Sequence, residues 1–217
     1  MENHRRLVCF DLDGTLIDGT VYIWQTLYET YVKDESLKKK ITEDYYAKRI
    51  TYEEWFLHDL EIFRDHGVTE EKMRASIRSL KLMKGARETL DELLSRGYKL
   101  ALISGSLSMV LDELFPDHPF SDVLINEVYF DDHGVISGGK ATPYDVEKKG
   151  EGLKVIASRE GIPLDRCFFV GDNENDLSIA ETAGFSIAFN CKSERLARVC
   201  NVVIYEKDLR KILTVIP

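Results

Sequence analysis

Short apolar runs alternate with helix-like stretches along most of the chain. Uninterrupted apolar runs bounded by polar residues or glycine are typical of strands buried on both faces of a parallel sheet. The predicted strands are residues 7–10, 98–103, 123–130, 135–136, 167–171, 185–189 and 202–204. The third and fourth flank the turn Asp-Asp-His-Gly and therefore predict a β-hairpin. Because helical segments separate the other strands, we expect an α/β fold with a mostly parallel sheet.

Residues 19–81 differ from the rest because helical periodicity continues there without an intervening strand. The helices predicted within this stretch are residues 21–32, 37–49, 52–66 and 70–80, and those predicted after it are residues 86–96, 107–114, 151–160, 177–183, 208–213 and a helix from Ser193. Aromatic residues are frequent in the stretch, and the core of a small helical bundle accounts for most of them. We expect a minority, near Thr20, Tyr46 and Tyr52, to face a crevice.

Two carboxylates follow the first predicted strand directly, because Asp11 and Asp13 come where its apolar run stops. Gly14 permits a sharp turn and Thr15 adds a hydroxyl, so both acids can point into the crevice above the sheet. Crowded carboxylates repel each other unless a cation or a proton lies between them. A divalent cation at Asp11, with Asp13 free to carry a proton, meets this requirement. A strand that ends in an ordinary Asp-Gly turn is the alternative interpretation.

Two other predicted strands also end in polar residues. The segment Ser104-Gly105-Ser106 precedes a predicted helix, whose free backbone N–H groups favour phosphate oxygens. The segment Asp172-Asn-Glu-Asn-Asp176 holds more acidic and amide residues than helix capping requires. A second carboxylate cluster at a second strand end is what a cation bridging two strands needs. Lys148 and Lys149 precede another helix, and by themselves they suggest solvated surface.

Composition limits the classes of function. The chain has 217 residues, 44% of them hydrophobic, which suffices for a full core and predicts one domain with a modest insertion. A formal net charge of -9 without a basic block makes nucleic acid and anionic membranes poor candidates as partners. We see no signal peptide or membrane span and expect a cytoplasmic protein. The four scattered cysteines favour buried free thiols over a zinc site or disulfides.

Four segments in order resemble the motifs of the haloacid dehalogenase-like superfamily: Asp11-Leu-Asp13-Gly-Thr, the strand that ends at Ser104, Lys149, and Gly171-Asp172-Asn-Glu-Asn-Asp176. The helical insertion after the first motif is similar to the phosphoserine phosphatase-like branch. The resemblance implies a doubly wound core from residues 1–18 and 82–217, with the first strand central, and a helical cap from residues 19–81.

The resemblance also implies a role for each motif residue. Asp11 is the nucleophile that becomes an aspartyl phosphate, and Asp13 is the acid and base. Lys149 neutralises Asp11 and the transferring phosphoryl group. The groups that hold phosphate oxygens are Ser104, the N–H of Gly105 and Asn175. The magnesium site comprises the side chains of Asp11 and Asp172 and the backbone carbonyl of Asp13, with Asp176 orienting metal-bound water or Lys149.

We therefore expect a magnesium-dependent phosphatase that acts on a small phosphorylated metabolite. Phosphoserine phosphatases use an acidic residue for the amino group of the substrate and an arginine for its carboxylate, and the corresponding positions here are Thr20 and Asp59. Arg49 or Arg64 could replace the arginine, and Asp18 the acid. Phosphoserine phosphatase is therefore the runner-up, and a catalytically silent protein that binds a phosphate ligand is the alternative from another class. The sequence leaves the oligomeric state open.

Overall fold

Seven strands form one sheet in which β1 (Arg6–Phe10) is central, between β4 and β7. The computed structural model describes residues 5–217. The sheet order is β6-β5-β4-β1-β7-β8-β9, and every neighbouring pair is parallel except β5 with β6. The other strands are β4 (Tyr98–Leu107), β5 (Asp122–Phe130), β6 (Ile136–Lys140), β7 (Cys167–Gly171), β8 (Phe185–Phe189) and β9 (Val202–Ile204). The predicted α/β class, mostly parallel sheet and central first strand are confirmed.

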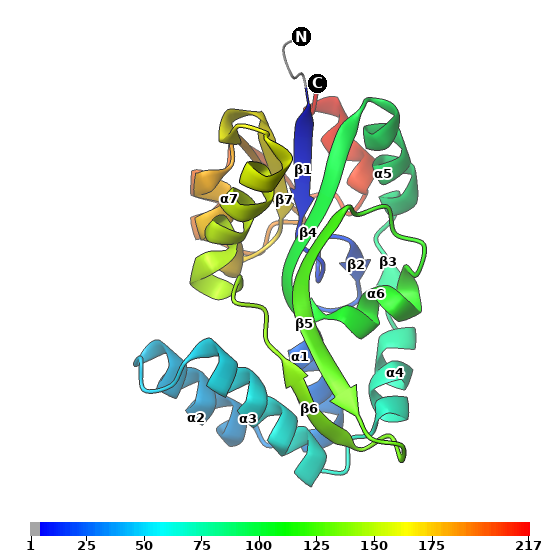
Figure 1. Cartoon of the computed structure of the whole chain (residues 1–217), viewed down its shortest axis with the longest axis vertical. Helices are drawn as coiled ribbons and strands as arrows, with labels where there is room; N and C mark the ends of the chain where they lie inside the picture. The colour runs from blue at the N-terminus through cyan, green and yellow to red at the C-terminus, as the bar shows by residue number, and fades with distance from the viewer. Residues whose placement is uncertain (1–4) are drawn as a thin grey trace.

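Helices cover both faces of this sheet (Figure 1). They are α5 (Ala86–Ser95), α6 (Ser108–Leu114), α7 (Lys149–Glu160), α8 (Leu177–Thr182), α9 (Glu194–Val199) and the 3-10 helix Leu209–Thr214. Successive residues of a strand face opposite sides. Val8 and Phe10 accordingly pack in the cluster that includes α5, whereas Leu7 and Cys9 pack in the cluster of α7, α8 and α9. The core thus has two hydrophobic layers with β1 between them.

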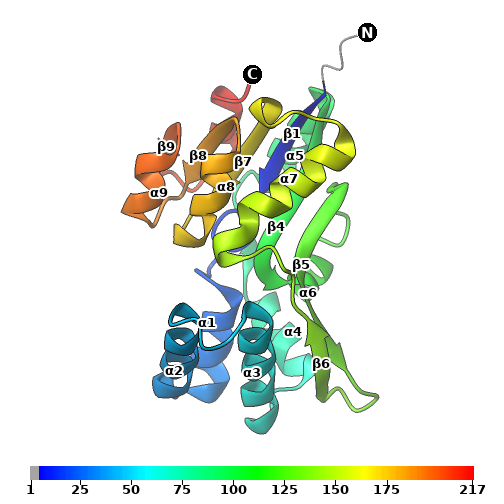
Figure 2. The ribbon, with the colours of Figure 1, turned by 60° about the vertical axis from the view of Figure 1, so that its left-hand side comes forward.

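The helical insertion, residues 19–81, lies beyond the carboxyl end of β1 (Figure 2). Its elements are α1 (Ile23–Leu27), a π-helical turn (Tyr28–Val32), α2 (Glu35–Tyr46), α3 (Tyr52–Asp65) and α4 (Glu70–Arg78). The chain enters and leaves through an antiparallel ribbon of β2 (Ile17–Asp18) and β3 (Lys81–Leu82). The single helix predicted at residues 21–32 is in fact α1 followed by the π-helical turn. Lys33 ends the π-helical turn in a left-handed conformation with φ 58°.

The hairpin β5–β6 also reaches the helical insertion. Gly139 lies so close to α3 that an added Cβ would come within 2.7 Å of Phe56 and 2.8 Å of Leu60. The backbone N–H of Glu70 donates to the carbonyl of Gly134 at 2.9 Å. The insertion thus rests on a hairpin from another part of the chain. The division into two domains at residues 18 and 82 stays a prediction.

Several predicted boundaries were wrong by a few residues. β4 continues through Ser104 to Leu107, so α6 begins at Ser108 rather than at residue 107. α7 begins at Lys149, and the last predicted helix is a 3-10 helix.

All four cysteines are free thiols, and Cys9 and Cys167 are buried. None of the helices within residues 5–217 combines the length and the apolar character needed to cross a bilayer.

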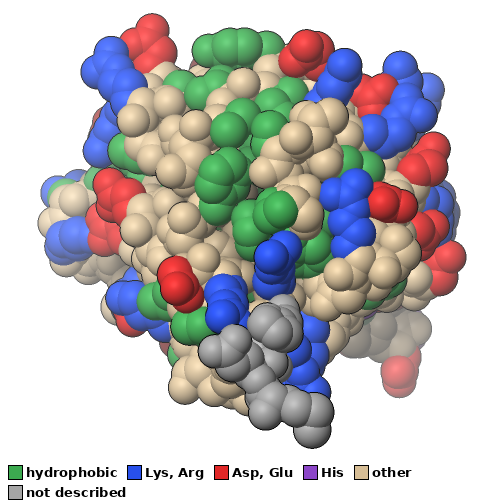
Figure 3. Space-filling model, turned by 90° about the horizontal axis from the view of Figure 1, so that it is seen from above, with side chains coloured by type: hydrophobic (Ala, Val, Ile, Leu, Met, Phe, Trp, Pro, Cys, Tyr) green, Lys and Arg blue, Asp and Glu red, His purple; other side chains and the backbone are tan. Residues whose placement is uncertain are grey.

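Charged side chains of both signs are interspersed at the end of the molecule that carries the termini (Figure 3). Hydrophobic side chains lie among them on this face. The polar ends of β1, β4 and β7 lie at the opposite end of the sheet, toward the helical insertion (Figure 2).

Candidate active site

Asp11 follows β1 directly, and its N–H donates to the carbonyl of Val170 in β7 at 3.0 Å. The chain then turns at Gly14, which has φ 76°. A Cβ at Gly14 would collide with the carboxylate of Asp172 and the ammonium of Lys192. Only glycine fits here, because the turn must let the end of β7 approach the end of β1.

Lys149 holds two carboxylates together. Its Nζ donates to Asp11 Oδ1 and to Asp176 Oδ1, each at 2.8 Å, and its side chain is fully buried. Burial by itself lowers the pKa of a lysine, but the charges of Asp11 and Asp176 outweigh burial and hold the pKa of Lys149 well above its ordinary value. The sequence by itself suggested solvated surface for Lys149. The structure instead places it beside Asp11, as the family resemblance implied.

Asp13 has only neutral hydrogen-bond donors. Its Oδ2 accepts from the N–H of Ile23 at 2.8 Å, and its Oδ1 accepts from the hydroxyl of Ser106 at 2.9 Å. Burial, followed by the charge of Asp11, raises the pKa of Asp13 to about 7. Asp13 can therefore carry a proton near neutral pH while Asp11 stays beside a lysine.

The segment Ser104–Ser106 lies opposite the end of β1. It forms an irregularity in β4, because the register with β5 shifts between Ile103 and Leu107. The carbonyl of Gly105 accepts from Trp24 Nε1 and from Asn126 Nδ2, each at 2.7 Å. The helix predicted to follow this segment begins at Ser108 with Leu107 as its N-cap, so the segment directly precedes the N-terminus of α6 although it belongs to β4. The two side chains fix the orientation of the segment.

Asn126 is a site residue that sequence reasoning missed. It is fully buried in β5, and its Nδ2 also donates to the hydroxyl of Tyr52 at 2.9 Å. Its Oδ1 accepts from the N–H of Thr142 at 2.8 Å. The hairpin was assigned no chemistry, although one amide within an apolar strand was a signal that this position has a polar partner.

The end of β7 supplies the second carboxylate cluster. Asp176 Oδ2 accepts from the N–H groups of Asp172 at 2.9 Å and Asn173 at 3.3 Å, so both of its oxygens have partners. Asp172 contacts Lys192 through Oδ2, whereas its Oδ1 is buried without a hydrogen-bond partner. Burial, followed by the charges of Asp11 and Asp176, raises the pKa of Asp172 to about 8. Asp11, Asp172 and Asp176 each offer an oxygen within 4.8 Å of the others, a spacing that suits a metal ion.

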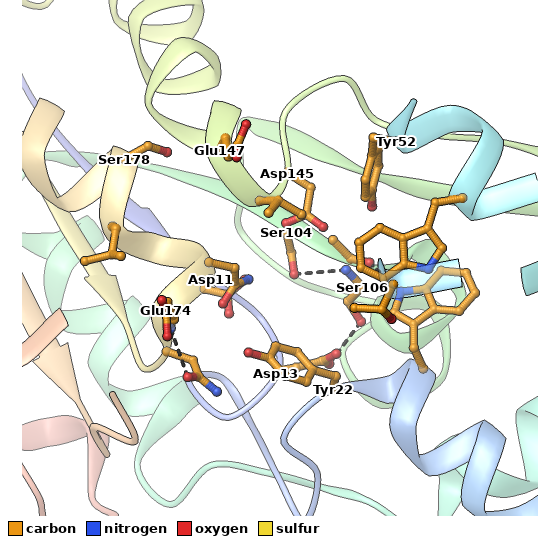
Figure 4. A pocket seen from close by; sticks show the side chains of 18 of the residues that line it. Asp11, Asp13, Tyr22, Tyr52, Ser104, Ser106, Asp145, Glu147, Glu174 and Ser178 are labelled. Carbon is orange, nitrogen blue, oxygen red and sulfur yellow. Dashed lines mark hydrogen bonds between the residues drawn. The ribbon is translucent and has the colours of Figure 1, made fainter. Parts of the chain in front are cut away.

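A cavity of about 860 Å³ joins these strand ends to the helical insertion (Figure 4). Predicted site residues that line it are Asp11, Asp13, Ser104, Gly105, Asn175, Tyr46 and Tyr52. Further lining residues from the insertion are Trp24, Tyr28, Lys38, Trp55, Phe56 and Asp59. The cavity therefore has a polar end at the sheet and a largely aromatic end at the insertion.

Thr20 does not line this cavity, because its hydroxyl is paired with that of Thr26 at 2.8 Å. Arg49 instead forms an ion pair with Asp44 at 2.6 Å, and Asp18 with Lys207 at 2.7 Å. Arg64 is exposed on α3 and does not line the cavity either. The structure thus brings the predicted catalytic residues together, but not the residues considered for a serine carboxylate and amino group.

Comparison with known proteins identifies the family. A model of haloacid dehalogenase-like hydrolases matches residues 5–184. The phosphoserine phosphatase of Methanocaldococcus jannaschii is 33% identical over 224 residues, covering 98% of each chain. Among solved structures, a phospho-aspartyl intermediate analogue of phosphoserine phosphatase has TM-score 0.79 at 28% identity, over 98% of this chain and 99% of that one. A substrate-bound phosphoserine phosphatase complex has TM-score 0.78 at 27% identity, over 100% of both chains. The chain therefore belongs to the haloacid dehalogenase-like hydrolase family, as a phosphatase of the phosphoserine phosphatase-like branch.

Proposed function

We propose that this phosphatase hydrolyses small phosphate monoesters with magnesium, through a phosphorylated Asp11. The observation that carries the proposal is the unequal environment of two neighbouring carboxylates. Asp11 is held by a buried ammonium, whereas Asp13 receives only neutral donors and has a raised pKa. A nucleophile must be ionised and a general acid must be protonated, and this arrangement meets both requirements near neutral pH.

The reaction proceeds in two steps, formation of an aspartyl phosphate and its hydrolysis. A carboxylate oxygen of Asp11 forms a bond to phosphorus while the bond from phosphorus to the ester oxygen breaks, and Asp13 gives its proton to the leaving alcohol. Water then attacks the phosphorus of the aspartyl phosphate and gives a proton to Asp13. Inorganic phosphate leaves, and Asp11 is regenerated. Ser104, the N–H of Gly105 and Asn175 hold the phosphate oxygens during both steps.

The carboxylates at the strand ends fit a magnesium ion. Asp172 Oδ1 is buried without a partner. Burial and the charges of Asp11 and Asp176 raise the pKa of Asp172 more than the contact with Lys192 lowers it. Both oxygens of Asp176 are already engaged, so Asp176 orients Lys149. The side chains of Asp11 and Asp172 and the carbonyl of Asp13 would hold the metal. Bound magnesium supplies the positive charge that lets a phosphate dianion enter this acidic site.

We expect L-phosphoserine, the substrate named for the relatives above, to be a poor substrate here. Its carboxylate needs a cation in a site without water. Asp59 lines the cavity at the position where the relatives are expected to carry an arginine. The arginines that line the cavity, Arg195 and Arg198, form ion pairs with Glu174 and Glu194, and Lys38 lies over the ring of Tyr28. One missing charge partner at a desolvated site costs on the order of 2 to 5 kcal/mol. The measurement is kcat/KM for L-phosphoserine beside glycerol, sugar, ethanolamine and choline phosphates.

If phosphoserine leads this series, the cavity holds its carboxylate by another route and the runner-up function is correct. Phosphate release from a generic aryl phosphate separates an enzyme from a silent binding protein. Activity should stop in a chelator, return with magnesium and return poorly with calcium, because calcium accepts more ligands at longer distances and can occupy both oxygens of Asp11. Full activity in the chelator would refute the metal assignment.

A further inference from the structure

Asp145 lies beside the phosphate-binding segment, although no step above uses it. It precedes the 3-10 helix Val146–Lys148 and lines the cavity. Its carboxylate lies directly over the Cα of Gly105, since a Cβ there would meet Asp145 Oδ1 at 2.7 Å and Oδ2 at a shorter distance. Figure 4 shows the side chains of Asp145 and Tyr52 directed toward the space beside Ser104. A carboxylate thus lies beside the segment that we propose to hold the phosphate oxygens.

Within the described part of the chain, Asp145 forms no close ion pair of the kind that neighbouring acids form, although its charge helps to raise the pKa of the buried Lys149. Glu147 forms an ion pair with Lys48 at 2.8 Å, and Glu174 forms one with Arg195. Within residues 5–217, Asp145 has no lysine, arginine or histidine nitrogen within salt-bridge distance, and its Oδ1 is buried without a hydrogen-bond partner. An anion in this position repels a phosphate dianion, and a positive charge on the leaving alcohol relieves that repulsion.

The walls of the cavity next to Asp145 suit a cation. Trp24 and Phe56 meet edge to face with ring centroids 5.6 Å apart, and Tyr52 and Trp55 meet in the same way at 6.3 Å. Aromatic rings attract cations, and more strongly where water is excluded. Burial, followed by the charge of Asp145, raises the pKa of Tyr52 well above its ordinary value, so its ring stays a neutral phenol. Lys38, which also lines the cavity, lies over the ring of Tyr28, 6.0 Å from its centroid.

We propose that Asp145 binds an ammonium group on the leaving alcohol, so that the preferred substrates are phosphate monoesters of small amino alcohols. This rests on the proposed function above and specifies its substrate class. Asp145 Oδ1 lacks a hydrogen-bond donor, which a primary ammonium supplies and a quaternary ammonium cannot. A carboxylate on the same alcohol is repelled by the charge of Asp145.

The test compares two esters of nearly equal shape, O-phosphoethanolamine and 2-hydroxyethyl phosphate, which differ in the charge of the terminal group. We expect kcat/KM of the unmodified enzyme to be at least about tenfold higher for the amine. Asp145→Asn should bring the ratio of the two values close to one. Glu147→Gln is the matched control, because Glu147 is already paired with Lys48, and it should keep the ratio.

Equal kcat/KM for the two esters in the unmodified enzyme would overturn the proposal, whether or not Asp145→Asn folds. A preference that persists in folded Asp145→Asn would also overturn it, because the ammonium then binds elsewhere. Faster turnover of phosphocholine than of phosphoethanolamine would contradict the hydrogen bond to Oδ1. An enzyme that releases phosphate from none of these esters, with magnesium present, contradicts the proposed function instead.

Discussion

Asp11 and Asp13 are chemically identical side chains two residues apart, and their neighbours alone make them different. An ammonium lies 2.8 Å from Asp11, whereas a backbone N–H and a hydroxyl contact Asp13. Both aspartates are almost completely buried, so solvent screens these differences little. The proposed division of labour between Asp11 as nucleophile and Asp13 as acid therefore depends on the surrounding residues.

Asp11→Asn should lower phosphate release by about 1000-fold or more, because an amide is a poor nucleophile and the change also removes a metal ligand. The variant should fold, since the side chain keeps its shape and Lys149 keeps Asp176 as a partner. The measurements are phosphate release and thermal unfolding followed by circular dichroism. Normal turnover by a folded variant would end the covalent hypothesis.

At the scale of elements, β5 couples the helical insertion to the sheet. Asn126 donates both to the hydroxyl of Tyr52 in α3 and to the carbonyl of Gly105 in β4. The peptide of Gly105 and Ser106 in turn places the hydroxyl that donates to Asp13. One buried amide therefore positions a wall of the cavity and the catalytic acid together.

Asn126→Ala should reduce kcat by about 10- to 100-fold with a smaller effect on KM, because small displacements of catalytic groups slow the reaction more than they weaken binding. Ser137→Ala, on the exposed part of the same hairpin, is the control and should leave both constants near their original values. An Asn126→Ala enzyme that folds and keeps its kcat would show that Gly105 is held sufficiently by Trp24.

Asp59, in α3, makes the free energy of unfolding of the protein depend on pH. Burial raises its pKa to about 7 from an ordinary value of 3.8, and its Oδ1 accepts from the hydroxyl of Tyr28 at 2.6 Å. Between about pH 4 and 7 the folded state holds a proton that the unfolded state has lost, so this group makes stability fall as pH rises through that window.

Asp59→Asn cannot ionise and should remove that part of the pH dependence. The quantity compared is the free energy of unfolding of the variant minus that of the original protein. We expect this difference to be larger at pH 8 than at pH 5, in favour of the variant, by on the order of 2 kcal/mol. Urea unfolding of both proteins at the two pH values measures this. The same difference at both pH values would mean that Asp59 stays ionised throughout.

At the scale of the whole molecule, the site exists only where separate parts of the chain meet. β1 and β7 supply the carboxylates, β4 supplies the phosphate-binding segment, and the helical insertion closes the cavity. Exposed contacts such as the ion pair of Lys48 with Glu147 also join the insertion to the core, but exposed pairs contribute little to stability. A metal ion at these carboxylates would be a stronger connection, because β1 and β7 both supply possible ligands.

Magnesium should therefore stabilise the folded protein. A ligand at 100 times its dissociation constant that binds only the folded state adds about 2.7 kcal/mol. We expect the Tm to rise with magnesium and also with calcium, although calcium supports little activity. Asp172→Asn should remove most of this rise. A Tm that is insensitive to both ions would contradict a metal site at these carboxylates.

The sequence by itself determined the architecture and which motif residues lie together at one edge of the sheet. Apolar runs fixed the strands, and the carboxyl ends of parallel strands share one edge of a sheet, so Asp11, Ser104 and Asp172 had to lie near one another. The match of Lys149-Gly-Glu to the family motif supplied the choice of Lys149 over Lys148. The structure agrees, because α7 begins so that Lys149 is buried and Lys148 is exposed.

Only the tertiary structure decided what surrounds that centre. Asn126, Asp145 and Trp24 belong to no motif. Asn126 and Trp24 meet at Gly105 because the hairpin and the insertion pack against each other, and Asp145 reaches Gly105 from the segment between β6 and α7. The structure also directs Thr20 and Arg49 to other partners. Periodicity predicts which face of an element is buried, but the side chains that meet across two elements depend on how those elements pack, and a local pattern does not contain that information.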